Sequence, residues 1–303
     1  MGETYETQSR YDGYTWRPSA ASANLVWEAN RILGSYTTRM TVRQLYYRLV
    51  AELIIPNNVA SYHNLVNVLT KARKVDLIAA DRFVDRGRAT TGPSGYDSLR
   101  QYINIIRNAY TRKPNDGQPH YVEVWTEKDA LSVVIGDAAD EYGVTLVVSK
   151  GYSSYTILTE AAKRLSREIE RRGSEGVHLL YFGDFDPSGE DIFRVICDET
   201  VALTGYSPHI EKIALTRALI DQYNLPPIPT KSTDTRTLGF VAAHGDEAVE
   251  LDALPPDELE VVVRSAVERY WDPEIREGII HKEEPERAAL HEALKPLDDL
   301  KVE

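Results

Sequence analysis

Between residues 121 and 215 the sequence alternates between short apolar stretches and longer amphipathic ones, and this alternation limits the fold more than any other feature. Apolar runs of strand length occupy 121–126, 144–148, 177–182 and 210–215. Segments with helical spacing occupy 129–142, 153–172 and 189–203 between them. Strands that alternate with helices in this way pair in parallel and carry helices over the sheet. The sequence therefore predicts an α/β fold.

The chain before this region is typical of a smaller helical module. Helical spacing covers Ala21–Leu33 and Tyr62–Val75, and a capping box at Thr41 and Gln44 begins a helix that runs to about Leu53. Residues 81–88 resemble a short wing. Three short helices and a wing outline a winged-helix module, a relative of the helix-turn-helix, although many such modules bind proteins instead of DNA.

A segment rich in proline and polar residues separates the two parts. Residues 112–119 contain two prolines and one glycine, which is typical of a linker or long turn. We therefore predict an N-terminal tail at 1–19, a winged-helix module at 20–113, and a parallel-sheet domain with a C-terminal extension at 120–303.

Three carboxylates follow the ends of two predicted strands. Glu127 lies just past 121–126, and Asp184 and Asp186 lie just past 177–182. Ligands of parallel sheets bind beyond the carboxyl ends of the strands, and residues two apart on an extended chain point to the same side. Carboxylates this close are costly unless a cation neutralises them or they take up protons, and oxygen-only ligands favour Mg²⁺ or Mn²⁺. The alternative is that Asp184 caps the next helix and Asp186 forms a turn.

The helix that begins at Thr41 carries two adjacent tyrosines with different expected positions. Tyr46 falls on the apolar stripe of this helix and is expected in the core. Tyr47 falls off the stripe, on the face that it shares with Arg43 four residues earlier. An exposed tyrosine beside an arginine could act as a nucleophile on a phosphate. The alternative is that Tyr47 only lines an interface.

Basic residues gather near the end of the third helix and in the wing. This set could contact DNA phosphates without reading sequence, or it could be a salt-bridged surface: Lys71, Arg73, Lys74, Arg82, Arg86 and Arg88. Residues 1–113 carry 16 basic and 9 acidic side chains, whereas the remainder carries 19 and 38. A basic N-terminal third on an acidic body is a weak indication of a polyanionic partner.

Composition excludes several classes of protein. Apolar residues make up 42% of the chain, which is typical of a globular protein. The single cysteine, Cys197, excludes an intramolecular disulfide framework and favours a reducing, cytoplasmic location. No apolar run is long enough to cross a bilayer, and residues 1–17 lack the layout of a secretory signal.

Two later stretches allow less specific interpretation. Residues 231–236 could place Lys231 and Arg236 near a phosphate, and Glu250–Pro255 is typical of a turn that leads into a helix at 256–270. Both could equally serve packing and capping. The tail after Ile280 is charged and is predicted to be a surface helix.

Taken together, these motifs resemble a known family. The segment Thr41–Tyr47 is similar to the one around the active tyrosine of topoisomerase VI A subunits and of the related meiotic double-strand-break proteins. The stretches 127–131, 150–152 and 184–189 resemble, in order, the three signatures of that family's Toprim domain. The likeness covers about residues 42–191 and is weaker over 215–254.

The resemblance implies a winged-helix module followed by a Toprim domain, a Rossmann-like parallel sheet. Tyr47 would attack a DNA phosphate with support from Arg43, and Glu127, Asp184 and Asp186 would hold Mg²⁺. Lys150 would contact DNA. The family works as a dimer in which the tyrosine of one protomer acts beside the metal site of the other. In the family the partner is a separate ATPase subunit, and this chain encodes no phosphate-binding loop of its own. Such a subunit, or another protein, could be a further partner.

Three functions follow from this reading. The first is a DNA-cleaving enzyme of the topoisomerase VI A type that acts on duplex DNA as a homodimer, at the nucleoid if the cell is a prokaryote. The second is a Toprim nuclease in which water is the nucleophile. The third is a module that binds DNA or a protein partner without catalysis.

Overall fold

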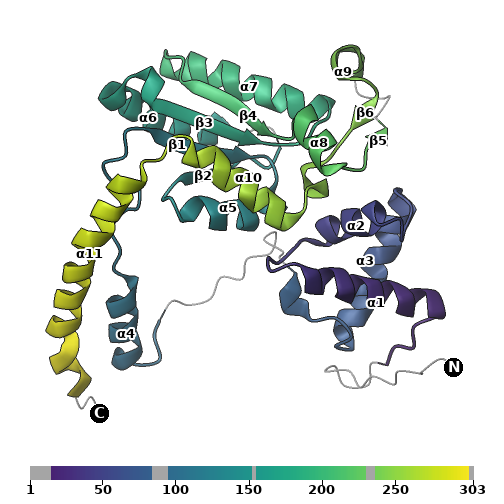
Figure 1. The fold of residues 1–303 in the computed structure, drawn as a ribbon, viewed down its shortest axis with the longest axis horizontal. Coiled ribbons are helices and arrows are strands. Elements are labelled where there is room, and N and C mark those ends of the chain that lie inside the picture. Colours follow the sequence, from purple (N-terminus) through teal and green to yellow (C-terminus); the bar gives the residue numbers. More distant parts are fainter. Residues whose placement is uncertain (1–14, 84–94, 152–154, 230–235, 300–303) are drawn as a thin grey trace.

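The computed structural model describes residues 15–83, 95–151, 155–229 and 236–299 of the chain. A four-stranded, all-parallel sheet with the order β2-β1-β3-β4 forms the centre of an α/β fold, as predicted (Figure 1). The strands are β1 (Tyr121–Thr126), β2 (Thr145–Val148), β3 (Val177–Phe182) and β4 (His209–Ala214). All four coincide with the predicted strands to within a residue.

The two faces of the sheet are buried by different helices, which explains why its strands are apolar on both sides. Val124 and Leu180 point toward α5 (Ser132–Asp140) and α10 (Pro256–Glu268), whereas Trp125 points toward α6 (Tyr155–Arg172) and α7 (Pro187–Thr204) on the other face. This alternation is the two-residue period of a strand. Short helices η2 (Asp129–Leu131) and η3 (Ser174–Gly176) connect strands to helices.

The N-terminal helices pack together at one end of the sheet domain. They are α1 (Ala20–Ser35), α2 (Val42–Ala51) and α3 (Val59–Lys74), each close to its predicted span. Thr41 caps α2, and the capping box with Gln44 is present. After η1 (Ala80–Arg82), Phe83 forms an isolated parallel bridge with Met40. The predicted wing lies mostly outside the described residues.

The segment from β4 to α10 wraps around the carboxyl end of the sheet. It contains α8 (Arg217–Tyr223), β5 (Ile228–Pro229), α9 (Thr237–His244), β6 (Glu247–Ala248) and η4 (Leu251–Ala253). Strands β5 and β6 form a small antiparallel pair. Of the predicted 231–236 stretch only Arg236 is described, and its guanidinium lies 3.3 Å from the Asp191 carboxylate.

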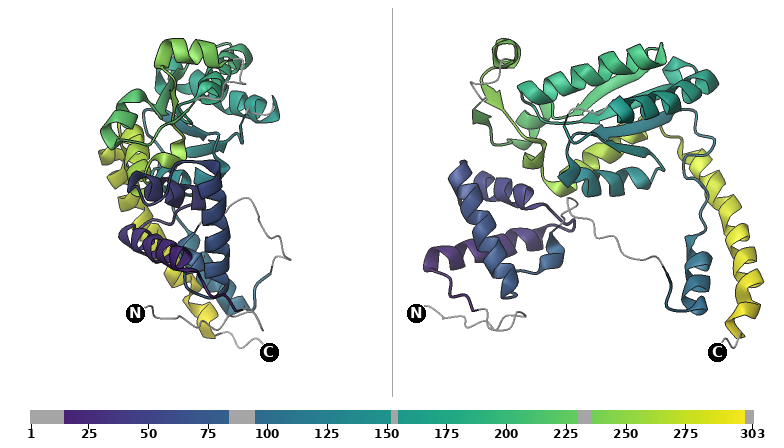
Figure 2. Two further views of the ribbon diagram at one scale, coloured as in Figure 1. Left: turned by 90° about the vertical axis from the view of Figure 1, so that its right-hand side faces the viewer. Right: turned by 180° about the vertical axis from the view of Figure 1, so that it is seen from behind.

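Two helices extend away from the sheet domain. Figures 1 and 2 show α4 (Leu99–Ala109) beside α11 (Pro273–Leu294), with the C-terminus near the far end of both. Helix α11 contains the predicted charged tail helix and leads into η5 (Lys295–Asp299). The sequence interpretation did not include α4.

Candidate active site

Glu127 and Asp184 meet at the carboxyl end of the sheet. Strands β1 and β3 are neighbours, with Thr126 opposite Phe182, so the residues that follow them are brought together. The backbone N–H of Asp184 donates a hydrogen bond to Glu127 Oε1 at 2.9 Å. These two acidic residues therefore lie close together, as the sequence predicts.

A lysine that the sequence interpretation missed lies between two buried carboxylates. Lys128 Nζ is 2.6 Å from Asp184 Oδ2 and 3.7 Å from Asp252 Oδ2. Burial raises the pKa of both aspartates, although the Lys128 ammonium opposes this, and the same carboxylates raise the pKa of Lys128 above its ordinary value. A lysine thus supplies one cation that the clustered acids require. The signal was present in the sequence, because Lys128 directly follows Glu127.

Asp186 has a structural contact at the start of α7. Its Oδ1 accepts a hydrogen bond of 2.6 Å from the N–H of Gly189, which is the geometry of a helix N-cap. Residue 189 must be glycine here, because a Cβ would collide with the backbone carbonyl of Asp184. The sequence offered the alternative that Asp184 caps this helix and Asp186 forms a turn. An aspartate does cap the helix, but it is Asp186 and not Asp184.

Oxygen donors dominate this end of the sheet, but no cage for a metal is assembled. Among the residues described, no group of three or more His, Cys, Asp or Glu side chains is arranged to hold a metal ion. In the same part of the chain, Glu127 and Asp186 each use one carboxylate oxygen for a backbone N–H. The other carboxylate oxygen of Glu127 and of Asp186 accepts no hydrogen bond from the described residues. Carboxylate oxygens of this kind are suitable ligands for Mg²⁺ or Mn²⁺.

The turn at 250–253 covers the face of α2 that carries Arg43 and Tyr47. The Arg43 guanidinium forms a bidentate pair with the Glu250 carboxylate. Arg48 donates a hydrogen bond to the carbonyl of Ala253. Tyr47 is only 2% exposed, so the prediction of an exposed tyrosine is wrong. The covering turn lies about 200 residues away along the chain, and helical periodicity within α2 could not show it.

The environment of Tyr47 keeps its hydroxyl protonated. Burial and the nearby Glu250 carboxylate, which is within hydrogen-bonding range, raise the pKa of Tyr47, and this outweighs the opposing charge of Arg43. Tyr46 behaves as predicted: it is 4% exposed, and its hydroxyl donates to Asn57 Oδ1 at 3.0 Å.

Helix η4 joins the two groups of side chains into one network. Glu250 contacts Arg43, and two residues later Asp252 faces Lys128 and accepts a hydrogen bond of 3.4 Å from Thr41 Oγ1. The network therefore runs from Tyr47 to the end of the sheet within a single chain. Sequence analysis treated Glu250–Pro255 only as a turn and missed both carboxylates.

The predicted DNA-binding residues divide into two groups. Lys71, Lys74 and Lys150 are exposed, and Lys150 Nζ lies 3.0 Å from Asp129 Oδ2. The other described members have packing roles: the Arg73 guanidinium lies 5.0 Å from the centre of the Phe83 ring, and Arg82 donates to the carbonyls of residues 33 and 36. Arg86 and Arg88 lie outside the described residues.

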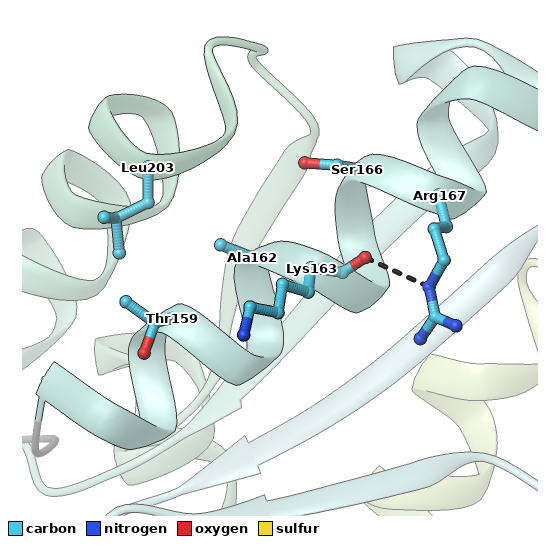
Figure 3. A pocket seen from close by; sticks show the side chains of 6 residues that line it. All are labelled: Thr159, Ala162, Lys163, Ser166, Arg167 and Leu203. Carbon is cyan, nitrogen blue, oxygen red and sulfur yellow. Dashed lines mark hydrogen bonds between the residues drawn. The ribbon is translucent and has the colours of Figure 1, made fainter.

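A concave surface lies on the helices of the sheet domain, away from this network. A groove of about 690 Å³ between α6 and α7 is lined by Thr159, Ala162, Lys163, Ser166, Arg167 and Leu203 (Figure 3). Its two cationic side chains are exposed, and the Arg167 guanidinium donates to the carbonyl of residue 163 at 3.2 Å. None of the described residues that line the groove is a carboxylate, so the network at the end of the sheet is the better candidate for catalysis.

Three histidines meet at the opposite, amino-terminal edge of the sheet. His178 Nε2 lies 3.0 Å from His120 Nδ1, and the His178 ring is 5.5 Å from that of His209. The His178 ring stacks on Tyr270 with a centroid distance of 3.7 Å. Burial, with the neighbouring imidazoles, lowers the pKa of His178 to about 4. The ring is therefore neutral at physiological pH.

Comparison with known proteins adds no assignment. No model of a protein family matches the chain, and no curated protein is significantly similar to it. Among the residues described, none of the helices is both long and apolar enough to traverse a lipid bilayer.

Proposed function

We propose that this protein cleaves the phosphodiester backbone of DNA with Tyr47 as the nucleophile. The observation that carries the proposal is the continuous network from Tyr47 and Arg43 through Glu250 and Asp252 to the carboxyl end of a parallel sheet. A nucleophile, a proton acceptor and a cation for the phosphate are the groups that such a reaction needs. The sequence resemblance to topoisomerase VI A subunits, with a winged helix at α1–α3 and a Toprim sheet domain, supports the same assignment.

The side chains have distinct roles in the proposed reaction. Glu250 accepts the hydroxyl proton of Tyr47 while the phenolic oxygen attacks the phosphorus atom. The bond from phosphorus to one sugar oxygen breaks, that oxygen takes a proton from solvent, and a tyrosyl phosphate ester forms. Arg43 exchanges its Glu250 contact for the phosphate and neutralises it. Attack by the released sugar hydroxyl reverses the step and reseals the strand.

Glu127 and Asp186 would hold Mg²⁺ or Mn²⁺ in this proposal, and Asp184 would join them by exchanging its contact with the Lys128 ammonium for the ion. The bound ion would supply charge stabilisation for the phosphate and the leaving oxygen. Millimolar Mg²⁺ should raise the melting temperature of the wild type by mass action, and Glu127→Gln should abolish most of that rise. An unchanged rise in Glu127→Gln would remove this carboxylate from the metal set.

A second candidate is hydrolysis, in which water attacks the phosphate and Tyr47 only contacts DNA. The specific observation in its favour is the burial of Tyr47, since 2% exposure and a raised pKa both oppose nucleophilic attack from the structure as described. The tyrosine route requires DNA binding to separate Arg43 from Glu250. The hydrolytic route does not.

A cleavage assay on end-labelled and supercoiled duplex DNA distinguishes these routes. Wild type, Tyr47→Phe, Glu127→Gln and the matched control Tyr46→Phe are incubated with Mg²⁺ and quenched with detergent. Label that stays on protein for wild type and Tyr46→Phe, but not for Tyr47→Phe, is the expected result. Free cut ends from Tyr47→Phe at the wild-type rate would establish the hydrolytic route instead.

Absence of cutting by every protein, with DNA binding retained, would overturn both catalytic routes for the isolated chain. It would favour the binding module, or an enzyme that needs the ATPase-type partner that the resemblance implies. A gel-shift assay with Lys71→Glu and Lys74→Glu tests the proposed DNA surface on α3. Removal of a cation that pairs with a phosphate should weaken the affinity for DNA and reduce its dependence on salt.

A further inference from the structure

The hydroxyl of Tyr181 is a buried polar group that the proposed chemistry does not use. Tyr181 lies on β3, on the face of the sheet that α6 and α7 cover, and is 1% exposed. Its ring stacks on that of Phe193 from α7, with a centroid distance of 5.4 Å. Among the described residues its hydroxyl has no hydrogen-bond partner. Buried hydroxyls are almost always hydrogen-bonded, so an exception of this kind is typical of a strained, catalytic or ion-binding position.

The phenol ring of Tyr181 extends along β3 toward the carboxyl end of the sheet. A Cβ on Gly183, two residues later, would lie only 2.4 Å from the hydroxyl oxygen and 2.6 Å from two ring carbons. The ring therefore lies over the backbone of Gly183, and residue 183 must lack a side chain to leave this space. The hydroxyl is thus placed beside the loop that begins at Asp184.

Carboxylates dominate the electrostatic surroundings of this hydroxyl. Burial and, after it, the negative charges of Glu127, Asp184, Glu190 and Asp186 raise the pKa of Tyr181. The phenol therefore stays protonated and can donate a hydrogen bond. Of the four carboxylates, Glu127 acts on it most strongly. The strand pairing agrees, because Tyr181 lies opposite residue 125 of β1, two residues before Glu127.

Glu127 is also the carboxylate with the best acceptor for this hydroxyl. Glu190 pairs with the Lys212 ammonium at 2.6 Å, and Asp184 pairs with that of Lys128 at 2.6 Å. In the described part of the chain Glu127 has no such cationic partner. One of its oxygens accepts the N–H of Asp184, and its second oxygen accepts no hydrogen bond there.

We propose that Tyr181 is a positioning residue of the divalent-ion site, and that its hydroxyl holds the Glu127 carboxylate in the orientation that binds the ion. The hydrogen bond runs to the second oxygen of Glu127, directly or through one water molecule. With the N–H of Asp184 on the first oxygen, the carboxylate is fixed from two directions, as the ligands of metal sites are by their outer hydrogen bonds. The inference rests on the proposed function only in assuming a divalent ion at Glu127, and it does not depend on Tyr47.

A tyrosine with only a packing role at position 181 would not need its hydroxyl. Phenylalanine fills the same space without a buried polar group, and such a group lowers stability when it lacks a partner. The chain instead has both the hydroxyl and a glycine at 183 that makes room for it. Action of the hydroxyl on Glu127 accounts for both residues.

Titration of the full-length protein with Mg²⁺ alone, followed by calorimetry, tests the proposal without DNA. Tyr181→Phe removes one oxygen atom and should raise the Mg²⁺ dissociation constant by about 10-fold or more, the usual effect of removing an outer hydrogen bond from a metal ligand. The matched control is Tyr142→Phe, which removes a hydroxyl that donates to Glu268 at 2.7 Å and precedes β2, at the other end of the sheet. This control should bind Mg²⁺ like wild type.

Urea denaturation in EDTA separates a positioning role from a structural one. Without the ion, Tyr181→Phe should be at least as stable as wild type, because it lacks the buried hydroxyl. An unchanged Mg²⁺ dissociation constant in Tyr181→Phe would overturn the proposal and leave the metal site in place, and lower stability in EDTA would then assign the hydroxyl a structural role. No Mg²⁺ binding by wild type would overturn the metal site and this inference together. Neither result bears on covalent attachment of DNA to Tyr47.

Discussion

At the scale of single residues, Lys128 decides the electrostatics of the candidate site. Asp184 and Asp252 are both buried, and the ammonium between them offsets their desolvation. A second lysine, Lys212, donates to the backbone carbonyl of Asp184 at 2.8 Å and to Glu190 at 2.6 Å. Two lysines of the chain therefore offset part of the negative charge at this end of the sheet.

Removal of the Lys128 charge should be costly to the fold. Lys128→Met leaves two buried carboxylates without their partner, and we expect a loss of about 3 kcal/mol in the free energy of unfolding, measured by urea denaturation. Lys150→Met is the matched control: its pair with Asp129 is largely exposed, and the expected loss is about 0–1 kcal/mol. Equal losses in the two variants would contradict this account of the site.

His178 should make stability depend on pH in a defined window. Its pKa is lowered to about 4 in the folded chain, against an ordinary value of 6.5, so between these values the unfolded chain binds more protons than the native one. The contribution of His178 is thus fully present above pH 6.5 and is lost as the pH falls toward 4. His178→Asn should reduce the slope of stability against pH by up to about 1.4 kcal/mol per pH unit. The test is to measure the free energy of unfolding by urea denaturation at several pH values. The same dependence on pH for wild type and His178→Asn would refute this role of His178.

At the scale of elements, the local sequence predicts those helices, strands and caps that are determined by residues close together along the chain. The strands and the capping box of α2 follow from periodicity and from Thr41 and Gln44, and the structure confirms them. The contact of Glu127 with the Asp184 backbone follows from strand adjacency. The burial of Tyr47 and the roles of Glu250 and Asp252 depend on η4 packing on α2, a contact between distant segments that no local pattern contains.

Helix α4 illustrates a different limit of sequence interpretation. Its periodicity is clear once the helix is known, but it lies between the predicted wing and a proline-containing linker and received no assignment. Ile103 is its only fully buried residue, so its apolar pattern reflects a surface more than a core. Sequence periodicity shows that a face is apolar, and only the structure shows that the face is left uncovered.

At the scale of the whole molecule, the N-terminal helices and the sheet domain share one hydrophobic core. Residues of α1, α2 and α3 belong to the same buried cluster as α5, α10 and η4. Leu251 lies at this junction and is fully buried. Unfolding of the N-terminal helices and the sheet domain should therefore be a single cooperative event.

A substitution at the junction tests this cooperativity. Leu251→Ala should lower the free energy of unfolding by about 2–5 kcal/mol. Tryptophan fluorescence and far-UV circular dichroism should shift to lower urea together and remain superimposed. Two separated transitions, in either the wild type or the variant, would show that the N-terminal helices unfold as an independent unit.

The turn that covers α2 is synthesised long after α2 itself, which delays assembly of the candidate site in a newly made chain. Arg43 and Glu250 are 207 residues apart, so a ribosome that has just released α2 must still synthesise a long stretch of chain before it adds Glu250. At about 5–20 residues per second this interval lasts on the order of 10–40 s. Throughout it, Tyr47 is without the turn that covers it, and Lys128, once it is made, is without Asp252. The network between them can form only after residues 250–252 have been added, so a nascent chain carries its tyrosine before it carries the complete site.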